Sequence, residues 1–478
     1  MPKGITKVSN MTSFSTEALR IFELQKAYSY TLKNSTHQER IKRLQTFKEA
    51  IVAHKTDISS AIFRDLGRDS LETDIIELMP VLSEINLIIK SLQDWMKPKM
   101  VKTPLLYSGT KSWISYEARG TTLIISPWNY PFQLVIYPVL SAIAAGNAVC
   151  MKLSEFTPNI NQVIKKIVQK SFPEKEVTVF EGEAKEAQIL LDLPFDHIFF
   201  TGSTNVGKIV MKKAAEHLSS VTLELGGKCP AIIDENTDIE VITQRIAWGK
   251  YINAGQTCLA PDYIMVHENV LNAFMDSFKT HLNDFTQNKE RASKVINLQH
   301  FKRLKNLFDD AIKLGAKVEM GGEFLESQQA IQPTIMTNVT PQMLIMQEEI
   351  FGPILPVMTF RRLEEVTEFV NSLTRPLALY VFSKNQNFVH EVVSQTHSGG
   401  VTINDVILHM ANHHLPFGGN GHSGQGCYHG HFGFLEFSHQ RAVLQRNVDL
   451  GTSYFYPPYT DSKKKLVATV IEKFSKLL

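Results

Sequence analysis

The sequence predicts an α/β protein that contains two doubly wound parallel sheets and a small β arm. Short apolar strands alternate with helical segments through residues 121–225, which is typical of βαβ units. The same alternation resumes after residue 226. Residues 97–110 contain two prolines and several lysines, so we expect this segment to leave the helical pattern as a linker or extended arm.

The N-terminal part is expected to be helical. Thr36 and Glu39 fit a capping box, and apolar residues follow at helical spacing from residue 41 to residue 51. A second helical pattern covers residues 75–95. Residues 113–117 alternate like an exposed strand, which would belong to the arm.

The first sheet is expected to place polar segments at one edge. Its predicted strands are residues 121–125, 148–152, 177–180, 197–200 and 221–225. Ligands of such sheets bind outside the carboxyl ends of the strands. Residues 126–129, 152–155 and 201–204 follow strands on this interpretation, and the last segment precedes a helix expected over 206–218.

The second sheet is expected in a domain that carries Cys258. Its predicted strands are residues 231–233, 263–266, 317–320, 354–359, 380–382 and 400–403. Gly226 and Gly227 would mark the junction between the domains, where active sites are common. We therefore divide the chain into a first domain (1–96 and 118–225), a second domain (226–415), bridging segments (97–117 and 416–450) and a C-terminal tail helix (451–478).

Composition limits the class of function. The chain has 478 residues, of which 43% are hydrophobic and 21% charged, and its net charge is only +2. This charge gives no general reason to expect a nucleic-acid partner. The four cysteines lack metal-ligand spacing and are too few for a disulfide scaffold, so we expect a reducing, cytoplasmic setting. Residues 1–16 do not resemble a signal peptide, and the apolar stretch 134–146 is too short to span a bilayer.

Cys258 and Glu224 are the two residues most suggestive of chemistry. Cys258 lies in a loop of small residues, and Glu224 ends an apolar strand just before two glycines. Covalent catalysis needs a nucleophile and a base that later activates water. On residue types alone two other interpretations stay open: Cys258 as a small buried hydrophobe, and Glu224 as a partner of Lys228.

Five further segments fit the same chemistry. They are residues 125–132, 151–155, 199–204, 348–353 and 415–419. In this order, and with Glu224 and Cys258, they resemble the aldehyde dehydrogenase superfamily over about residues 41–446. Tyr130 and the segment 428–439 resemble class 3 of that superfamily, including its fatty and coniferyl aldehyde branches. The resemblance implies two Rossmann-like domains, one cofactor-binding and one catalytic, and an oligomerisation arm.

The resemblance also implies a mechanism. Cys258 would attack the aldehyde, and the Asn129 side chain and the Cys258 backbone N–H would hold the oxyanion. Glu224 would activate water for hydrolysis of the thioester, which makes a carboxylic acid the product. Tyr130 and Phe417 would contribute to the substrate pocket.

A cofactor site follows from the same resemblance. The cofactor is expected to be NAD, with NADP also possible. Lys152 would bind ribose hydroxyls, and Glu155 would bind the 2′-hydroxyl and repel a 2′-phosphate. A glycine-serine turn before a helix suits a pyrophosphate because free N–H groups and the helix dipole favour anions. The expected cofactor contacts are Trp128, Lys152, Glu155, Gly202, Ser203, Glu349 and Phe351.

The expected partners are an aldehyde substrate and a second copy of the chain in a homodimer. No nucleic acid and no integral membrane segment are expected, although the lysine-rich tail could contact a membrane surface weakly. The histidine-rich segment 409–439 raises the alternative of a metal site, but no cysteine or carboxylate accompanies it at ligand spacing. Two alternative functions stay open: a cofactor-independent esterase or thioesterase, and a non-catalytic homologue with a binding role.

Overall fold

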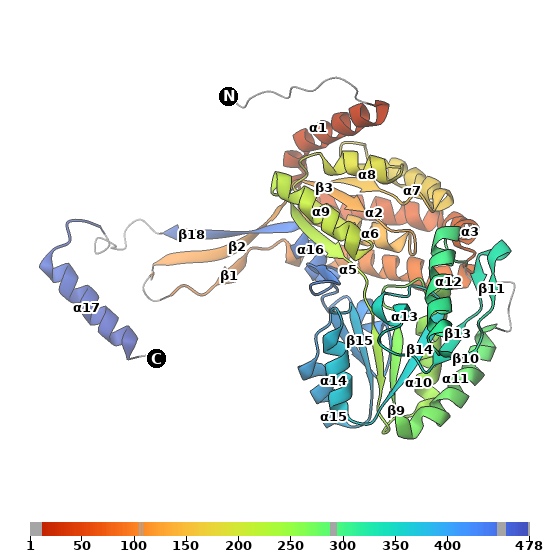
Figure 1. Ribbon diagram of the computed structural model, residues 1–478. Coiled ribbons are helices and arrows are strands. Elements are labelled where there is room, and N and C mark those ends of the chain that lie inside the picture. The colour runs from red at the N-terminus through yellow and green to blue at the C-terminus, as the bar shows by residue number, and fades with distance from the viewer. Residues whose placement is uncertain (1–11, 105–106, 108, 287–293, 447–455, 477–478) are drawn as a thin grey trace. The chain divides into compact units, whose positions relative to one another are not determined.

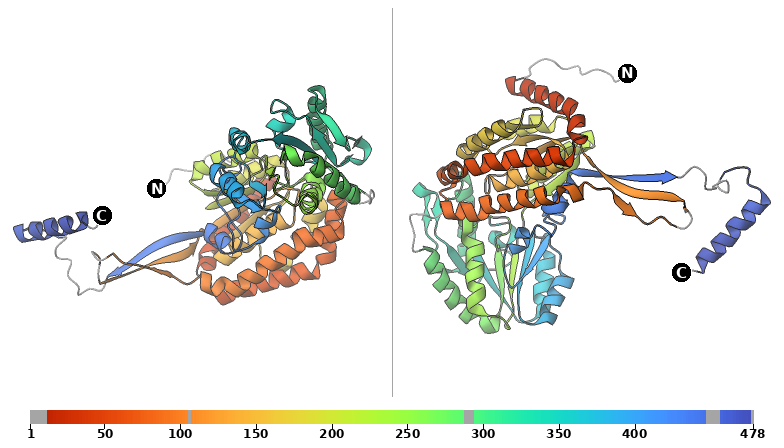
Figure 2. Two further views of the ribbon diagram at one scale, coloured as in Figure 1. Left: turned by 90° about the horizontal axis from the view of Figure 1, so that it is seen from below. Right: turned by 180° about the vertical axis from the view of Figure 1, so that it is seen from behind.

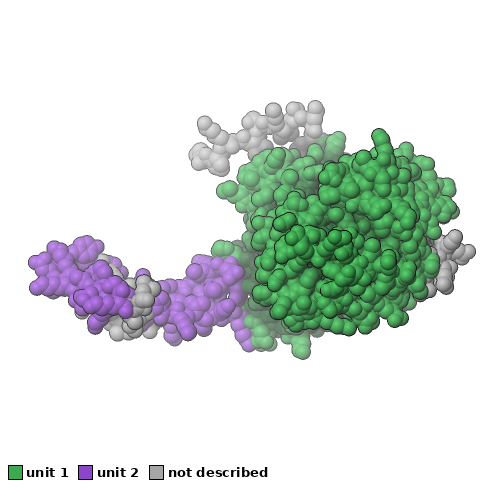
Figure 3. Space-filling model, turned by 60° about the horizontal axis from the view of Figure 1, so that its bottom comes forward, with its two compact units in different colours: residues 1–96, 117–439 green, residues 97–116, 440–478 purple. Residues whose placement is uncertain are grey.

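The computed structural model describes residues 12–104, 107, 109–286, 294–446 and 456–476. The outer ends of the expected first domain and tail, residues 1–11, 451–455 and 477–478, lie outside these residues. The chain forms two compact units, coloured separately in Figure 3. The first comprises residues 1–96 and 117–439, and the second comprises residues 97–116 and 440–478. Residues 416–439, which we grouped with the bridging segments, belong to the first unit.

The N-terminal part of the first unit is helical, as the sequence predicts. Thr36 caps the second helix in a complete capping box with Glu39, which satisfies backbone N–H groups at the helix start. A single turn of π-helix at residues 74–78 interrupts the helical stretch of residues 70–95, and such helices are rare. The elements are α1 (Ser13–Lys33), α2 (His37–Ala53), α3 (Lys55–Leu66), α4 (Ser70–Thr73), the π-helix η1 (Asp74–Leu78) and α5 (Met79–Trp95).

The first sheet has six strands in the order β17-β7-β6-β3-β4-β5. Five strands are parallel, and β17 adds an antiparallel edge. The chain leaves β3 for β4 on one side and returns with β6 on the other, so β3 and β6 flank a topological switch point. The strands are β3 (Thr121–Ile125), β4 (Ala148–Lys152), β5 (Val177–Phe180), β6 (His197–Thr201), β7 (Ser220–Glu224) and β17 (Gly424–Gln425).

Helices separate the parallel strands of this sheet. Right-handed crossovers put the helices after β3 and β4 on one face and those after β5 and β6 on the other. Every residue of α6 is buried, which confirms that the apolar stretch 134–146 is a core helix. The helices are α6 (Gln133–Ala145), α7 (Pro158–Ser171), α8 (Ala184–Leu191) and α9 (Thr204–His217).

The second sheet has seven strands in the order β10-β13-β14-β9-β8-β15-β16. All neighbours are parallel except β10 and β13. The strands are β8 (Pro230–Ile233), β9 (Tyr263–His267), β10 (Lys317–Met320), β13 (Thr334–Thr337), β14 (Ile354–Phe360), β15 (Ala378–Phe382) and β16 (Gly400–Ile403). A small hairpin pairs β11 (Phe324–Leu325) with β12 (Ala330–Ile331). The two parallel sheets confirm the predicted fold class.

Helices cover both faces of the second sheet, with α14 and α15 on one side and α10 and α11 on the other (Figures 1 and 2). They enclose a core of fully buried aliphatic side chains that includes Ile232, Leu379 and Val381. The longer helices are α10 (Ile239–Tyr251), α11 (Leu271–Thr286), α12 (Leu298–Lys313), α14 (Leu363–Ser372) and α15 (Gln386–Gln395). The short α13 (Leu344–Gln347) and α16 (Gly430–Glu436) complete the first unit.

The second unit contains a three-stranded sheet and the tail helix. The sheet has the order β1-β2-β18, with β1 (Lys99–Val101), β2 (Thr110–Ala118) and β18 (Ser438–Arg446). Strand β1 is fully exposed and runs antiparallel to β2. The tail helix α17 (Asp461–Ser475) contains no buried residue. None of the described helices has the length and apolar composition needed to cross a bilayer.

The core of the second sheet generates a stability prediction. Replacing fully buried Ile232 with alanine is expected to lower the free energy of unfolding by about 2–5 kcal/mol, because the deletion leaves a cavity among packed side chains. The matched control is Ile312→Ala on α12, whose side chain is exposed and should change stability by less than about 1 kcal/mol. Urea unfolding followed by circular dichroism measures both variants. Equal effects would show that Ile232 is not a core residue.

Candidate active site

Cys258 lies on a half-buried loop between α10 and β9. The φ angle is positive at three consecutive residues of this loop. It is 51° at Asn253, 53° at Ala254 and 71° at Gly255. An alanine in this region costs about 1–2 kcal/mol, so contacts elsewhere must hold the turn. At Gly255 a side chain would lie 2.3 Å from the carbonyl oxygen of Gly352. This tight turn determines where Thr257 and Cys258 face.

Cys258 and Glu224 line the same cavity, whose volume is about 340 Å³. Glu224 comes from the end of β7 in the first sheet, whereas the cysteine loop belongs to the second. Most of the remaining wall is apolar and includes Ile75, Met79, Leu134, Trp248, Leu377 and Phe417. The cavity can therefore accept an apolar molecule between a thiol and a carboxyl group.

Glu224 is buried, and neither of its carboxylate oxygens has a hydrogen-bond partner among the described residues. Burial is the main reason that its pKa lies well above the usual value, and the nearby charge of Glu436 raises it further. The alternative that Glu224 pairs with Lys228 is wrong. Lys228 instead contacts Asp262 and donates to the backbone oxygens of Ile345 and Glu348.

The Cys258 thiol has a raised pKa in this environment. Burial is the largest cause, followed by the negative charges of Glu349 and Glu224. Hydrogen bonds from the backbone N–H groups of Cys258 and Leu259 act in the opposite direction. The thiol form is therefore favoured at neutral pH in the free protein.

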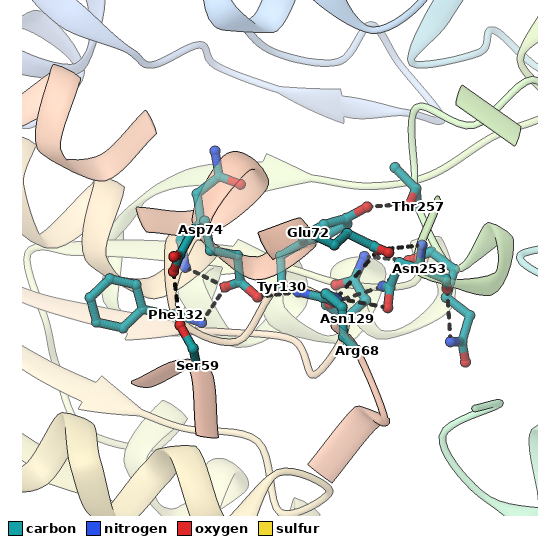
Figure 4. Close-up of polar contacts among 12 residues, drawn as sticks. Ser59, Arg68, Glu72, Asp74, Asn129, Tyr130, Phe132, Asn253 and Thr257 are labelled. Atoms are coloured by element: carbon teal, nitrogen blue, oxygen red, sulfur yellow. Dashed lines mark hydrogen bonds and ion pairs between the residues drawn. The ribbon is translucent and has the colours of Figure 1, made fainter. Parts of the chain in front are cut away.

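Asn129 follows β3 at the switch point of the first sheet, and it contacts the cysteine loop directly (Figure 4). Its side-chain Nδ2 donates to the carbonyl oxygen of Gln256 at 3.0 Å. In the other direction, Nδ2 of Asn253 donates to the carbonyl oxygen of Asn129, also at 3.0 Å. Asn129 is buried but does not line the cavity.

Tyr130 and Phe417 both line the cavity. The Tyr130 hydroxyl lies 2.5 Å from Oγ1 of Thr257, the residue before the cysteine. Burial raises the pKa of this phenol, so it remains protonated and can act as a donor. The Phe417 ring stacks on His429 with centroids 5.0 Å apart. These contacts make the two aromatic side chains rigid parts of the wall.

Lys152 and Glu155 form an ion pair at the carboxyl end of β4. The Lys152 Nζ lies 3.2 Å from Oε2 of Glu155, and the lysine is buried whereas the glutamate is exposed. Ser203 begins helix α9, and its hydroxyl accepts from the N–H of Val206 at 3.4 Å. The turn at Gly202 is close-packed, because a side chain there would lie 2.5 Å from the Phe200 ring.

Glu349 lies against the glycine junction between the two sheets. A side chain on Gly226 would lie 2.1 Å from Oε2 of Glu349, so a larger residue there would displace the Glu349 carboxylate. The pKa of Glu349 is raised to about 8, mainly by burial and then by the charge of Asp262, while a hydrogen bond from the Gly227 backbone acts in the opposite direction. Arg303 and Lys228 also favour the ionised form.

Phe351 packs edge-on against Trp128, with ring centroids 5.5 Å apart. Its φ of 50° is unusual for an aromatic residue and indicates that its surroundings hold the backbone in place. Trp128 also meets the His300 ring. None of the seven residues assigned to the cofactor lines the cavity that contains Cys258, Glu224, Tyr130 and Phe417.

The histidine-rich segment has structural contacts. Among the residues that the structure describes, no group of three or more histidine, cysteine or acidic side chains could hold a metal ion. His413 pairs with buried Glu84 at 2.6 Å, and His429 contacts the backbone oxygen of Met410 at 3.0 Å. Burial lowers the pKa of His429 to about 4, so it is neutral at pH 7.

Arg68 was not singled out from the sequence, although it is fully buried beside the two loops. It contacts the carbonyl oxygen of Asn129, the side chain of Asn253 and the carboxylate of Glu77. In the sequence, Arg68 and Asp69 lie between two helices, and such a charged pair is typical of a solvent-exposed loop. The one available signal was Glu77, a charged residue inside the otherwise apolar run at residues 75–81.

Comparison with known proteins decides the family. Residues 5–443 match the model of the aldehyde dehydrogenase family, which is most of the chain. The chain belongs to the aldehyde dehydrogenase family. It is a class 3-like member and an NAD(P)-dependent oxidoreductase that converts aldehydes to acids. The predicted resemblance and enzyme class are thus confirmed.

Several aldehyde dehydrogenases are similar over nearly the whole length. Aldehyde dehydrogenase family 3 member A2 of Macaca fascicularis is 41% identical and covers 89% of this chain and 88% of its own. The dimeric NADP-preferring aldehyde dehydrogenase of Rattus norvegicus is 42% identical and covers 87% and 92%. The substrate-bound structure of Staphylococcus aureus AldH is 41% identical, with a TM-score of 0.90, and covers 95% and 99%.

The electrostatics of the cavity generate a pH prediction. Alkylation of Cys258 by iodoacetamide in the free enzyme should increase with pH, with a midpoint above the ordinary thiol pKa of about 8.5. Glu349 has a pKa of about 8 and is ionised in this range, so Glu349→Gln should move the midpoint to lower pH. Peptide mass spectrometry follows Cys258 separately from the other cysteines, and Glu216→Gln on the exposed face of α9 is the control. An unchanged midpoint in Glu349→Gln would contradict the assignment.

Proposed function

We propose that this aldehyde dehydrogenase oxidises medium- or long-chain aliphatic or aromatic aldehydes through a covalent intermediate on Cys258. The observation that carries the proposal is the shared cavity, in which a thiol and an unpaired carboxyl group face an otherwise mostly apolar space. An apolar wall favours hydrocarbon substrates because burial of their surface drives binding. Tyr130 and Phe417 would shape the part of the pocket that accepts the substrate.

Addition to the aldehyde is the first step. The Cys258 thiol would first release its proton to solvent. Its sulfur then forms a bond to the carbonyl carbon, and the π electrons of the C=O bond move to oxygen. The backbone N–H of Cys258 and the side chain of Asn129 would donate to this oxyanion. Asn129 has two N–H groups, and the bond to Gln256 accounts for only one. Its second N–H would therefore serve the oxyanion.

The residues present fit an NAD(P) cofactor. Lys152 and Glu155 offer a cation and a carboxylate at the sheet edge, and α9 offers free N–H groups at its start. Val206 and Ile209 are exposed on α9, which provides an apolar surface for an adenine ring. Gly202, Glu349, Phe351 and Trp128 would complete the site. When bound, the cofactor accepts the hydride that the covalent intermediate loses.

Glu224 would act in the hydrolysis of the resulting thioester. Its raised pKa makes it a suitable base near neutral pH. The carboxylate takes a proton from water as the water oxygen bonds to the acyl carbon. The carbon–sulfur bond then breaks, which releases the carboxylic acid and the Cys258 thiolate.

We also propose a homodimer in the cytoplasm, joined through the second unit. Strand β1 and helix α17 expose Met100, Ile471 and Phe474 by 50% or more, and a second copy of the chain could cover these apolar side chains. The name of the rat relative describes a dimer that prefers NADP. The four free cysteines suit a reducing compartment.

The catalytic assignment predicts different failures for two variants. Cys258→Ala should abolish reduction of the cofactor with every aldehyde, because no covalent intermediate forms. Glu224→Gln should release about one equivalent of reduced cofactor in a burst and then turn over about 10²–10⁴-fold more slowly, because only hydrolysis loses its base. Stopped-flow absorbance at the reduced-cofactor band measures both. Full steady-state activity in Cys258→Ala would eliminate Cys258 as the nucleophile.

The cofactor assignment predicts a change of preference. Glu155→Gln should raise kcat/KM for NADP relative to NAD by roughly 5–50-fold, because it removes a negative charge from the expected position of the 2′-phosphate. It would also free Lys152, its ion-pair partner, to bind the phosphate. Glu181→Gln, another glutamate paired with a lysine on this domain, is the control. An unchanged NADP/NAD ratio would place the ribose elsewhere.

A further inference from the structure

Arg68 is the centre of a buried polar cluster that joins three parts of the first unit (Figure 4). Its side chain has no solvent exposure. Nε donates to Oδ1 of Asn253 at 3.2 Å, one terminal nitrogen contacts Glu77, and the other contacts the carbonyl oxygen of Asn129. One guanidinium therefore reaches the π-helix η1, the loop after β3 and the loop before Cys258.

Glu77 makes this position suitable for a buried cation. It lies on η1, and its second oxygen accepts the N–H groups of Phe132 at 2.8 Å and Gln133 at 2.9 Å. These N–H groups belong to the start of α6, where the helix has no other side-chain cap. The pair of Arg68 and Glu77 thus fixes the chain on both sides of the loop that carries Asn129.

Two carbonyl groups in the cluster each accept two donors. The Asn129 oxygen accepts from Arg68 and from Nδ2 of Asn253. The Gln256 oxygen accepts from Nδ2 of Asn129 at 3.0 Å and from Nδ2 of Asn253 at 3.2 Å. The backbone and the side chain of Asn129 are therefore both held against the loop that carries Cys258.

We propose that Arg68 is a positioning residue for Asn129 in oxyanion stabilisation. The inference rests on the proposed role of Asn129. An oxyanion donor is effective only if it is already oriented before the charge develops, so displacement of the Asn129 peptide weakens it. A planar guanidinium can bond Glu77, Asn253 and Asn129 together because it presents several donors in fixed directions. A lysine retains the charge opposite Glu77 but not this set of directions.

An arginine with a purely structural role would form its hydrogen bonds to groups outside the active site, unlike Arg68. Arg40 is such a case, since it is also buried and donates to the backbone oxygens of Ala144 at 2.9 Å and Lys33 at 3.0 Å. Those contacts join helices away from the cavity. Two of the three Arg68 hydrogen bonds instead go to the loops that carry the oxyanion donor and the nucleophile.

A double-mutant cycle tests the proposal. Arg68→Lys is combined with Asn129→Ala, and kcat is measured with saturating cofactor and aldehyde. We expect Asn129→Ala to lower kcat by about 10²–10³-fold and Arg68→Lys to lower it by about tenfold or more. In the Asn129→Ala background, Arg68→Lys should change kcat by less than about twofold, because the group that it positions is absent. Arg40→Lys is the matched control and should leave kcat unchanged.

Each outcome has one meaning. Equal losses from Arg68→Lys in both backgrounds would overturn the positioning role while leaving that of Asn129 intact. An unchanged kcat in Asn129→Ala would reject the oxyanion assignment itself. Alkylation of Cys258 by iodoacetamide forms no oxyanion and should keep its rate in Arg68→Lys; a slower rate would show that Arg68 shapes the cysteine loop instead. If Arg68→Lys does not fold, the double variant Arg68→Gln/Glu77→Gln removes both buried charges and repeats the cycle.

Discussion

The hydrogen bonds between Asn129 and residues 253–256 determine the geometry on which the catalytic cavity depends. They join the end of strand β3 in one sheet to the loop before strand β9 in the other. The left-handed turn at Asn253 and Ala254 is unfavourable by itself, so these bonds offset part of its cost. Cys258 and Glu224 face one cavity because these hydrogen bonds hold the loops of the two sheets together.

The Cys258 thiol interacts with two buried carboxyl groups, that of Glu224 in the cavity wall and that of Glu349 outside the wall. Their negative charges, together with burial, raise the pKa of Cys258, and burial likewise raises those of Glu224 and Glu349. Each group is thus kept largely neutral in the free protein, which avoids unpaired charges in an apolar space. A proton transfer that neutralises one carboxylate favours the thiolate, so the three groups titrate as one system. Buried residues with perturbed pKa values are typical of active sites.

The sequence predicted some elements of the fold and missed others, for physical reasons that differ from element to element. Apart from β13 and the two-residue β17, the strands of both large sheets were predicted to within two residues, because strands that are buried on both faces form short continuous apolar runs. Strand β13 was missed because it has only two apolar residues, which lie between two threonines and follow a proline. The exposed strand β1 lacks an apolar pattern, and the π-helix η1 was read as part of a regular helix. In both cases long-range pairing or packing, rather than local preference, decides the structure.

The sequence by itself determined the α/β fold class, most strands of the two sheets, the family and the candidate roles of Cys258, Glu224 and Asn129. These follow from local periodicity and from short motifs, which can be recognised without knowledge of the tertiary structure. Only the tertiary structure decided that Lys228 pairs with Asp262 rather than Glu224, and that Arg68 contacts both catalytic loops. The physical reason is that burial and hydrogen-bond partners arise when distant segments pack together, here 34 to 185 residues apart, and no local pattern encodes them.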